Sequence, residues 1–296
     1  MAVTTLTSTR SRIGAYVALT KPRIIELLLV TTVPVMFVAE RGVPPLGLVV
    51  ATVLGGSLAA GGANAINMVV DRDIDALMER TRNRPLVTGE LTPRGALTFA
   101  IGLEVAAFLL LWRTVNLLSA VLAVSACLFY VFVYTLWLKR TSKQNIVIGG
   151  AAGAVPTLIG WTAVTGELAW APVVLFGVIF FWTPPHFWAL AIRYRDDYSA
   201  ADVPMLPSVA DDHTVGNQIV AYAVVVWALT LVFIPVADMG PLYGVAAIVL
   251  GAVFCGQCLR LRSDPTPERA MALFHWSITY VTLLFGAMAV DPLLFG

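Results

Sequence analysis

The chain has 296 residues, of which 58% are hydrophobic and 12% are charged. Because an ordinary soluble domain carries roughly 25% charged residues, this composition excludes a soluble globular protein and indicates an integral membrane protein. The formal net charge of +1 gives no electrostatic support for a nucleic-acid partner, so none is expected.

Apolar segments long enough to cross a bilayer, about 20 residues each, recur from one end of the sequence to the other. They predict an all-α integral membrane protein that forms a single polytopic domain over residues 1–296. We expect nine transmembrane helices, but only Arg113, Thr114 and their neighbours separate the third from the fourth, so a count of eight stays open. The predicted spans cover residues 22–39, 46–70, 95–113, 115–138, 145–165, 168–192, 216–236, 241–260 and 268–290.

Basic residues give the orientation, because Lys and Arg accumulate on cytoplasmic loops. Nine spans with an inner N-terminus put 17 of the 19 basic residues on the cytoplasmic side and leave Arg41 and Arg113 outside. We therefore expect a multi-pass protein of the cell (cytoplasmic) membrane with its C-terminus outside. No cleavable signal is evident, so we expect the first span to be retained. The inner set is Arg10, Arg12, Lys21, Arg23, Arg72, Arg80, Arg82, Arg84, Arg94, Lys139, Arg140, Lys143, Arg193, Arg195, Arg260, Arg262 and Arg269.

The two largest loops, about residues 71–94 and 193–215, are both predicted to be cytoplasmic, and both begin with acidic residues. The predicted outer connections are short and nearly uncharged, for example ERGVPP at residues 40–45. We therefore expect the function to be carried out at the cytoplasmic face.

The second span ends in NMVVDRDID, in which Asn67, Asp71 and Asp75 are spaced by four residues. If the helix continues, this spacing places the three side chains on one face. Mg²⁺ takes one or two carboxylates and keeps its other positions for water and substrate phosphate, so the stripe predicts a Mg²⁺-bridged phosphate or diphosphate. The alternative is a polar helix end solvated in the headgroup zone. Asp73 lies off the stripe and is expected in solvent or paired with Arg72.

Two clusters of basic residues could contact the same phosphate groups. Arg80, Arg82 and Arg84 lie within the downstream segment RTRNRPL and its neighbours, and arginine forks match phosphate oxygens bidentately. A second compact loop could contact the outer phosphates, and it consists of Lys139, Arg140 and Lys143. The alternative for both clusters is the cytoplasmic bias of basic residues alone.

The sixth span carries FFWTPPHFWALAIRYRDDY, where Pro184 and Pro185 predict a broken helix that lines a cavity. His186 could ligate heme iron or move a proton, and a hydrogen-bonded helix histidine is the alternative. The aromatic side chains could stabilise an allylic carbocation or form an interfacial belt. These side chains are Phe181, Trp182, Phe187, Trp188 and Tyr194.

The second acidic loop resembles a degenerate copy of the first. A shift of 126 residues lays Asp71 on Asp197, with Arg193 replacing Asn67 and Ala201 replacing Asp75. The shift suggests that the second and sixth spans face one another across a central cavity, as in other internally duplicated membrane folds. Two further carboxylates, Glu26 and Glu104, fall within spans and are expected to face the interior or water.

Several long segments resemble the protoheme IX farnesyltransferases, or heme O synthases, of the intramembrane UbiA-type prenyltransferase superfamily. They are LTKPRIIELLLVTT at 19–32, NMVVDRDID at 67–75, RTRNRPL at 80–86, YTLWLKRTSKQNIVIGGAAGAVP at 134–156, TPPHFWALAIRYRDDY at 183–198 and VPMLP at 203–207. The resemblance implies a nine-helix bundle around a central cytoplasm-facing cavity with a lateral opening to lipid. It also implies transfer of the farnesyl group of farnesyl diphosphate to a vinyl group of heme b, with addition of water, in a membrane setting and with Mg²⁺.

By motif position, the resemblance implies that Asn67, Asp71 and Asp75 form the first Mg²⁺-diphosphate motif and that Asp197 belongs to the second. Arg84 and Lys139 match basic positions near the diphosphate. Together with these six residues we expect a substrate-binding set made up of Arg80, Arg140, Lys143, Arg193, His186, Trp182 and Tyr194. The resemblance does not identify a downstream partner such as a heme A synthase or a heme-delivery protein.

The chain departs from the family pattern after the second motif. ADVPMLP places Asp202 where glycine is common, and Ala201 stands four residues after Asp197, so the superfamily's second D-x-x-x-D spacing is absent. We carry no ligand role onto Asp202. Two alternatives stay open, a prenyltransferase for a quinone precursor and an ion-coupled transporter. A transporter site is expected near the bilayer midplane, whereas the acidic residues lie at cytoplasmic helix ends.

Overall fold

The computed structural model describes residues 11–296, so Arg10 of the cytoplasmic basic set lies outside the described residues. Within that range the chain forms helices and turns and no strand. The helices are α1 (Arg12–Thr20), α2 (Pro22–Glu40), α3 (Leu46–Val70), α4 (Arg72–Leu77), α5 (Pro93–Thr114), α6 (Leu117–Leu128), the π-helix η1 (Phe129–Leu138), α7 (Lys139–Thr141), α8 (Asn145–Thr165), α9 (Trp170–Arg193), α10 (Arg195–Ala200), α11 (Leu206–Val209), α12 (Asp212–Val236), α13 (Pro241–Ser263) and α14 (Pro267–Phe295). The fold class is therefore all-α, as the composition predicts.

Eight segments within the described residues are long and apolar enough to cross a membrane: α3, α5, the continuous run Leu117–Thr141, α8, α9, α12, α13 and α14. The separation between the third and fourth predicted spans is real, because α5 ends at Thr114 and the Asn116 side chain caps the start of α6. The first predicted span coincides with α2, whose apolar stretch Val30–Glu40 is shorter. The count of nine stays a prediction.

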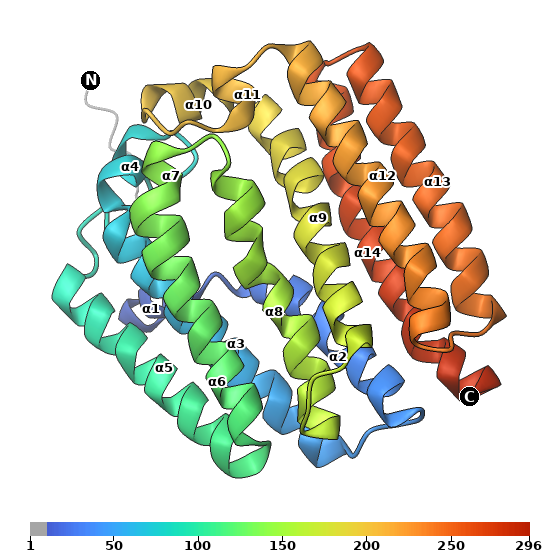
Figure 1. Ribbon diagram of the computed structural model, residues 1–296. Helices are drawn as coiled ribbons and strands as arrows, with labels where there is room; N and C mark the ends of the chain where they lie inside the picture. The colour runs from blue at the N-terminus through green and yellow to red at the C-terminus, as the bar shows by residue number, and fades with distance from the viewer. Residues whose placement is uncertain (1–10) are drawn as a thin grey trace, which may run out of the picture.

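The long helices lie side by side in one bundle (Figure 1). Successive helices pack against one another in chain order from α3 through α5, α6, α8, α9, α12 and α13 to α14, and α14 packs back against α2, which contacts α3. The largest apolar core fills the second half, among α9, α12, α13 and α14. Because α8 contacts both α3 and α9, the helix ends that carry the two acidic loops belong to neighbouring parts of the bundle. The central, cytoplasm-facing cavity stays a prediction.

The predicted break in the sixth span is wrong, since α9 runs unbroken through Pro184 and Pro185. Both prolines are buried, and packing against α8, α12 and α14 keeps the segment helical although proline removes backbone donors. The Thr183 hydroxyl donates to the Ile179 carbonyl at 2.8 Å, within the helix just before the prolines.

Small residues at the start of α8 allow two close approaches. A Cβ added at Gly149 would lie 2.3 Å from a ring carbon of Tyr134, and one added at Gly150 would lie 3.0 Å from Thr183. These glycines therefore bring η1 and α9 against α8, in agreement with helix packing through small residues.

The two remaining carboxylates differ in position. Glu104 points toward α3, because a Cβ added at Gly62 would lie 2.6 Å from Glu104 Oε1. This placement confirms the expectation that Glu104 faces the interior. Glu26 is exposed near the start of α2.

Candidate functional site

The acidic stripe forms where α3 passes into α4. The Asp71 amide donates to the Asn67 carbonyl and the Asp75 amide to the Asp71 carbonyl, each at 2.8 Å, so the chain keeps a helical path across the junction. The side chains of Asn67, Asp71 and Asp75 consequently share one face, as their spacing predicts. All three residues are buried, and Asp71 is 0% exposed. A solvated helix end is therefore not what these residues form.

Basic side chains neutralise both buried carboxylates. The Lys139 ammonium donates to Asp71 Oδ2, and Arg84 Nη1 donates to Asp75 Oδ2 at 2.6 Å. Arg140 Nη2 lies 3.8 Å from Asp71 Oδ1. Buried charges persist only when they are paired and hydrogen-bonded, so these contacts explain how two carboxylates are kept at the end of a membrane helix.

Lys21 joins this site, and sequence reasoning missed it. Its ammonium donates to Asn67 Oδ1 at 2.9 Å. The backbone of Lys21 is left-handed, with φ 51° and ψ 64°, and it ends α1 and begins α2 just before Pro22. Burial, followed by the positive charges of Arg84 and Lys139, lowers the pKa of Lys21 to about 7. The available signal was a lysine next to a helix-starting proline in LTKPR.

The donor set fits a hard cation. Asp71 Oδ1 is buried and has no hydrogen-bond partner in the part of the chain that the structure describes, so one carboxylate oxygen is left for a ligand. Within residues 11–296 there is no cluster of three His, Cys, Asp or Glu side chains that could hold a metal ion by itself. Mg²⁺ needs only one or two protein carboxylates, with substrate phosphate completing its shell.

The π-helix η1 supplies the opposite wall. Asn67 Nδ2 donates to Asp71 Oδ2 at 2.6 Å and lies 3.2 Å from Thr135 Oγ1 on η1. Lys139 follows at the end of η1. Short π-helical segments frequently occur at functional sites, and here the segment sets which residues of the span reach α3. No pattern in the sequence indicated it.

Asp73 pairs with Arg140 rather than with Arg72. Both guanidinium nitrogens of Arg140 donate to the Asp73 carboxylate at 2.7 Å, and this hydrogen bonding lowers the pKa of Asp73 to about 2. Arg72 instead donates to the Val69 carbonyl at 3.4 Å. The expected Asp73–Arg72 pair is therefore wrong, because Arg140, at the end of the run Leu117–Thr141, presents a bidentate fork to Asp73. The alternative expectation, that Asp73 lies in solvent, is confirmed, since the residue is exposed.

The second acidic loop touches the first. Asp197 accepts from the backbone amides of Glu79 and Arg80 at 3.3 and 3.5 Å. The Arg80 guanidinium donates to the Tyr198 hydroxyl at 3.1 Å and lies over the Tyr194 and Tyr198 rings, 5.7 and 5.2 Å from their centroids. These contacts bring the two loops together, and they leave the Asp197 carboxylate with long contacts only.

Other predicted cations lie farther out. Lys143 and Arg193 are exposed, and neither has an ion-pair partner within residues 11–296. Arg82 lies 3.6 Å from Glu79 in a surface pair. The structure therefore separates Arg84, which reaches the buried stripe, from its neighbour Arg82, which does not.

His186 and Trp182 lie where α9 packs on α14. His186 Nδ1 is 2.7 Å from Ser277 Oγ, and its ring stacks on Trp182 and Phe274 at centroid distances of 4.4 and 4.6 Å. Trp182 Nε1 donates to the Ser277 carbonyl at 3.1 Å. This geometry favours the hydrogen-bonded alternative for His186, and contact of either residue with heme stays a prediction.

Comparison with known proteins gives one consistent family. Residues 28–278 match the UbiA prenyltransferase family. The protoheme IX farnesyltransferase of Streptomyces avermitilis is 55% identical over 290 residues, covering 96% of this chain and 95% of the relative. The protoheme IX farnesyltransferase of Nocardioides sp. is 56% identical over 295 residues, covering 98% and 94%.

Solved structures agree on the fold. A digeranylgeranylglyceryl phosphate synthase superposes with a TM-score of 0.79 at 16% identity, covering 96% of this chain and 99% of that one. A UbiA homolog from Archaeoglobus fulgidus bound to GPP and Mg²⁺ superposes with a TM-score of 0.65 at 16% identity, covering 93% and 100%. At this identity the likeness establishes the bundle and not the chemistry.

Proposed function

This chain belongs to the UbiA prenyltransferase family, and within it to the protoheme IX farnesyltransferases, and on that premise we propose that it farnesylates heme b to make heme O. The bond between C1 of the farnesyl group and its diphosphate oxygen breaks, and a vinyl carbon of heme b bonds to C1. Water adds to the resulting cation beside the porphyrin and releases one proton. The products are heme O, diphosphate and a proton.

The observation that carries this proposal is the buried stripe, in which one carboxylate oxygen of Asp71 has no hydrogen-bond partner among the described residues. We assign Asn67, Asp71 and Asp75 to hold Mg²⁺ against the diphosphate. When bound, Mg²⁺ would neutralise charge on the diphosphate and so make it a better leaving group.

The basic residues of the site complete the cradle. Lys21, Arg84 and Lys139 contact the three stripe residues, so three basic side chains face two carboxylates. On substrate binding, these side chains turn from the stripe to the phosphate oxygens. Once they have turned, their donors are in place before negative charge develops on the leaving group, and the chemical step then needs little further reorganisation.

The second loop closes the site from the other side. We assign Asp197 to a further Mg²⁺ contact, since its present contacts of 3.3 and 3.5 Å are weak enough to exchange. Arg80, stacked with Tyr194, and Arg140 lie beside the stripe and serve the diphosphate. Lys143 and Arg193 are exposed cations suited to the propionate carboxylates of heme b.

The site faces the cytoplasm in this proposal. Its residues lie in or beside loop 71–94, loop 193–215 and the basic segment 139–143, which hold much of the chain's positive charge. The membrane is accordingly the cell membrane, with both substrates entering from its inner leaflet.

The decisive experiment is mass spectrometry of heme recovered after the purified protein is incubated with heme b, farnesyl diphosphate and Mg²⁺. We expect a new heme heavier by one farnesyl group and one hydroxyl group, and we expect EDTA to abolish its formation. Product formation that survives EDTA would overturn the Mg²⁺ assignment alone. If heme and farnesyl diphosphate stay unchanged and the same protein prenylates a quinone precursor, the assignment of heme b as the acceptor would be overturned.

A further inference from the structure

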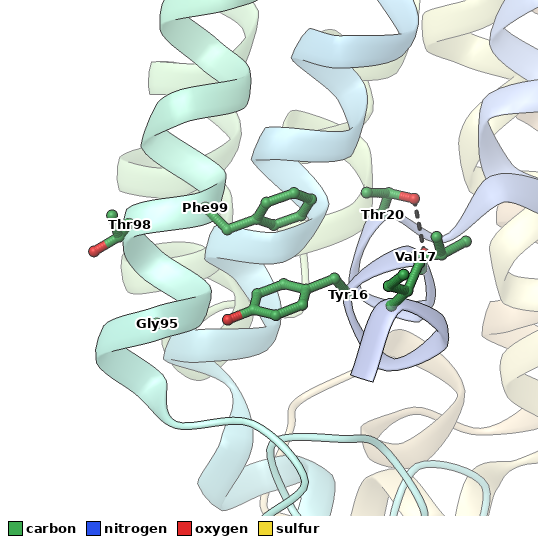
Figure 2. A pocket seen from close by; sticks show the side chains of 7 residues that line it. Tyr16, Val17, Thr20, Gly95, Thr98 and Phe99 are labelled. Carbon is green, nitrogen blue, oxygen red and sulfur yellow. Dashed lines mark hydrogen bonds between the residues drawn. The ribbon is translucent and has the colours of Figure 1, made fainter. Parts of the chain in front are cut away.

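A groove of about 650 Å³ lies between α1 and the first two turns of α5, away from the acidic stripe. Figure 2 shows Tyr16 of α1 and Phe99 of α5 side by side between the two helices, with their ring centroids 4.9 Å apart. The lining residues are Ile13, Tyr16, Val17, Thr20, Gly95, Thr98 and Phe99. None of them has a role in the farnesyl transfer proposed above.

The exposed side of α1 is apolar. Ile13 is 78% exposed and Val17 is 51% exposed, while Ala15 and Leu19 on the other side are buried. An open apolar groove beside an apolar helix face is matched to hydrocarbon and would be costly in water. In a membrane-spanning chain this pattern points to a lipid chain.

Two arginines flank the groove. Arg12 precedes Ile13 and Arg94 precedes Gly95, and both arginines are exposed. Neither forms an ion pair with any residue that the structure describes. Both belong to the predicted cytoplasmic basic set, so they lie where an anionic headgroup would be, next to a groove that suits its acyl chain.

We propose that this groove binds an anionic phospholipid, with an acyl chain along Tyr16 and Phe99 and the phosphate at Arg12 and Arg94. Gly95 lets the Tyr16 side chain approach α5 and form this wall of the groove, because a Cβ there would lie only 3.1 Å from the Tyr16 hydroxyl. An anionic headgroup supplies the counter-charge that neither arginine has among the described residues, so the charges of the flanking arginines favour this lipid.

The same groove is connected to the acidic site. The Thr20 carbonyl accepts from Asn64 Nδ2 at 3.2 Å, and the next residue, Lys21, donates to Asn67. A lipid that holds α1 against α5 therefore also holds Lys21 in position.

Native mass spectrometry tests the proposal without reference to catalysis. The purified protein is mixed with equal amounts of phosphatidylglycerol and phosphatidylcholine that carry identical acyl chains. We expect retention of phosphatidylglycerol over phosphatidylcholine, with the preference falling about fivefold for each of Arg12→Gln and Arg94→Gln, which corresponds to about 1 kcal/mol per charge. Val17→Trp, which fills the groove, should reduce retention of both lipids.

Arg113→Gln is the matched control, because Arg113 lies at the opposite end of the same helix and is also exposed. Equal retention of the two lipids by the unmodified protein, or an equal effect of Arg113→Gln and Arg94→Gln, would overturn the proposal. The proposal would also be overturned if the unmodified protein formed dimers that Val17→Trp dissociated, because the groove would then bind a second copy of the chain. If the unmodified protein prefers phosphatidylglycerol but does not farnesylate heme b, that result would count against the proposed function only.

Discussion

A shift of 126 residues lays Asp71 on Asp197, but the two carboxylates differ in place and in surroundings. Asp71 caps the end of α3, whereas Asp197 lies within the short helix α10 that follows α9. Asp71 is fully buried and paired with Lys139. Asp197 is half-buried and accepts only from two backbone amides, at 3.3 and 3.5 Å. The first carboxylate is therefore preorganised for its ligand, and the second has to move to reach one.

The difference originates in the cations that each loop gathers. The first loop receives basic side chains from the α1–α2 junction, from its own Arg84 and from α7. In the second loop Arg195 pairs with Asp212 instead, and Arg193 is exposed. On the proposed function we therefore expect the first loop to set the affinity for Mg²⁺ and the diphosphate, and the second loop to complete the site once they are bound.

Asp71→Asn should have the largest effect. Loss of the buried charge leaves Lys139 without a counter-ion and removes the proposed metal ligand, so kcat/KM for heme farnesylation should fall by at least roughly 10³-fold, about 4 kcal/mol. The matched control is Asp264→Asn, which breaks an exposed pair with Arg269 worth at most about 1 kcal/mol. Size-exclusion profiles in detergent establish folding, and near-normal turnover of a folded Asp71→Asn protein would disprove the assignment.

Arg84→Gln comes next. The Arg84–Asp75 contact of 2.6 Å is largely screened from solvent and holds Arg84 at the site. In the proposed function Arg84 then donates to the diphosphate, and a charged hydrogen bond of this kind is worth about 1.5–3 kcal/mol. The KM for farnesyl diphosphate should therefore rise roughly 30-fold. Arg82→Gln removes only the surface contact with Glu79 and should change that KM less than about twofold. Equal effects of the two variants would mean that the loop's net charge, and not the Arg84 geometry, attracts the diphosphate.

Asp197→Asn should have a smaller effect, about tenfold in kcat/KM, or 1.4 kcal/mol. If Asp197 turns to a metal ion, the half-saturating Mg²⁺ concentration should rise as well. Asp196→Asn, at its exposed neighbour, should leave both quantities within about twofold. A lower rate at an unchanged Mg²⁺ requirement would instead make Asp197 a structural link between the loops.

The features that could be predicted from sequence are those set by local periodicity. Apolar length located the spans, and the four-residue spacing placed Asn67, Asp71 and Asp75 on one face, because the backbone bonds that fix that face join residues four apart.

The partners of these residues come from distant segments and could not be predicted in the same way. Lys21 is 46 residues from Asn67 and Lys139 is 68 residues from Asp71. Asp73 was expected in solvent or paired with the neighbouring Arg72, but the π-helix and the close contact at Gly149 bring Arg140 to it instead.

Local rules also failed at Pro184–Pro185, where a missing donor predicts a break. Tertiary packing decided the outcome, because three neighbouring helices bury the segment. A single sequence carries no local signal for such packing.

The smallest predicted effect concerns Asp202, which stands where the family commonly has glycine. Its φ of 50° lies in the left-handed region, which glycine adopts without strain and which costs other residues roughly 1–2 kcal/mol. Asp202→Gly should remove this strain, although glycine also raises the entropy of the unfolded chain and so offsets part of the gain. The net stabilisation should be about 0.5 kcal/mol, which corresponds to a rise of roughly 1–2 °C in Tm. Asp202→Ala should lower Tm, because alanine adopts the left-handed region less readily than aspartate does. Asp202 is exposed and lies outside the proposed site, so the rate of heme farnesylation should be the same in both variants. A lower Tm in both variants would show that the carboxylate itself makes a stabilising contact, and a lower rate in both would give the second loop a ligand that its spacing did not predict.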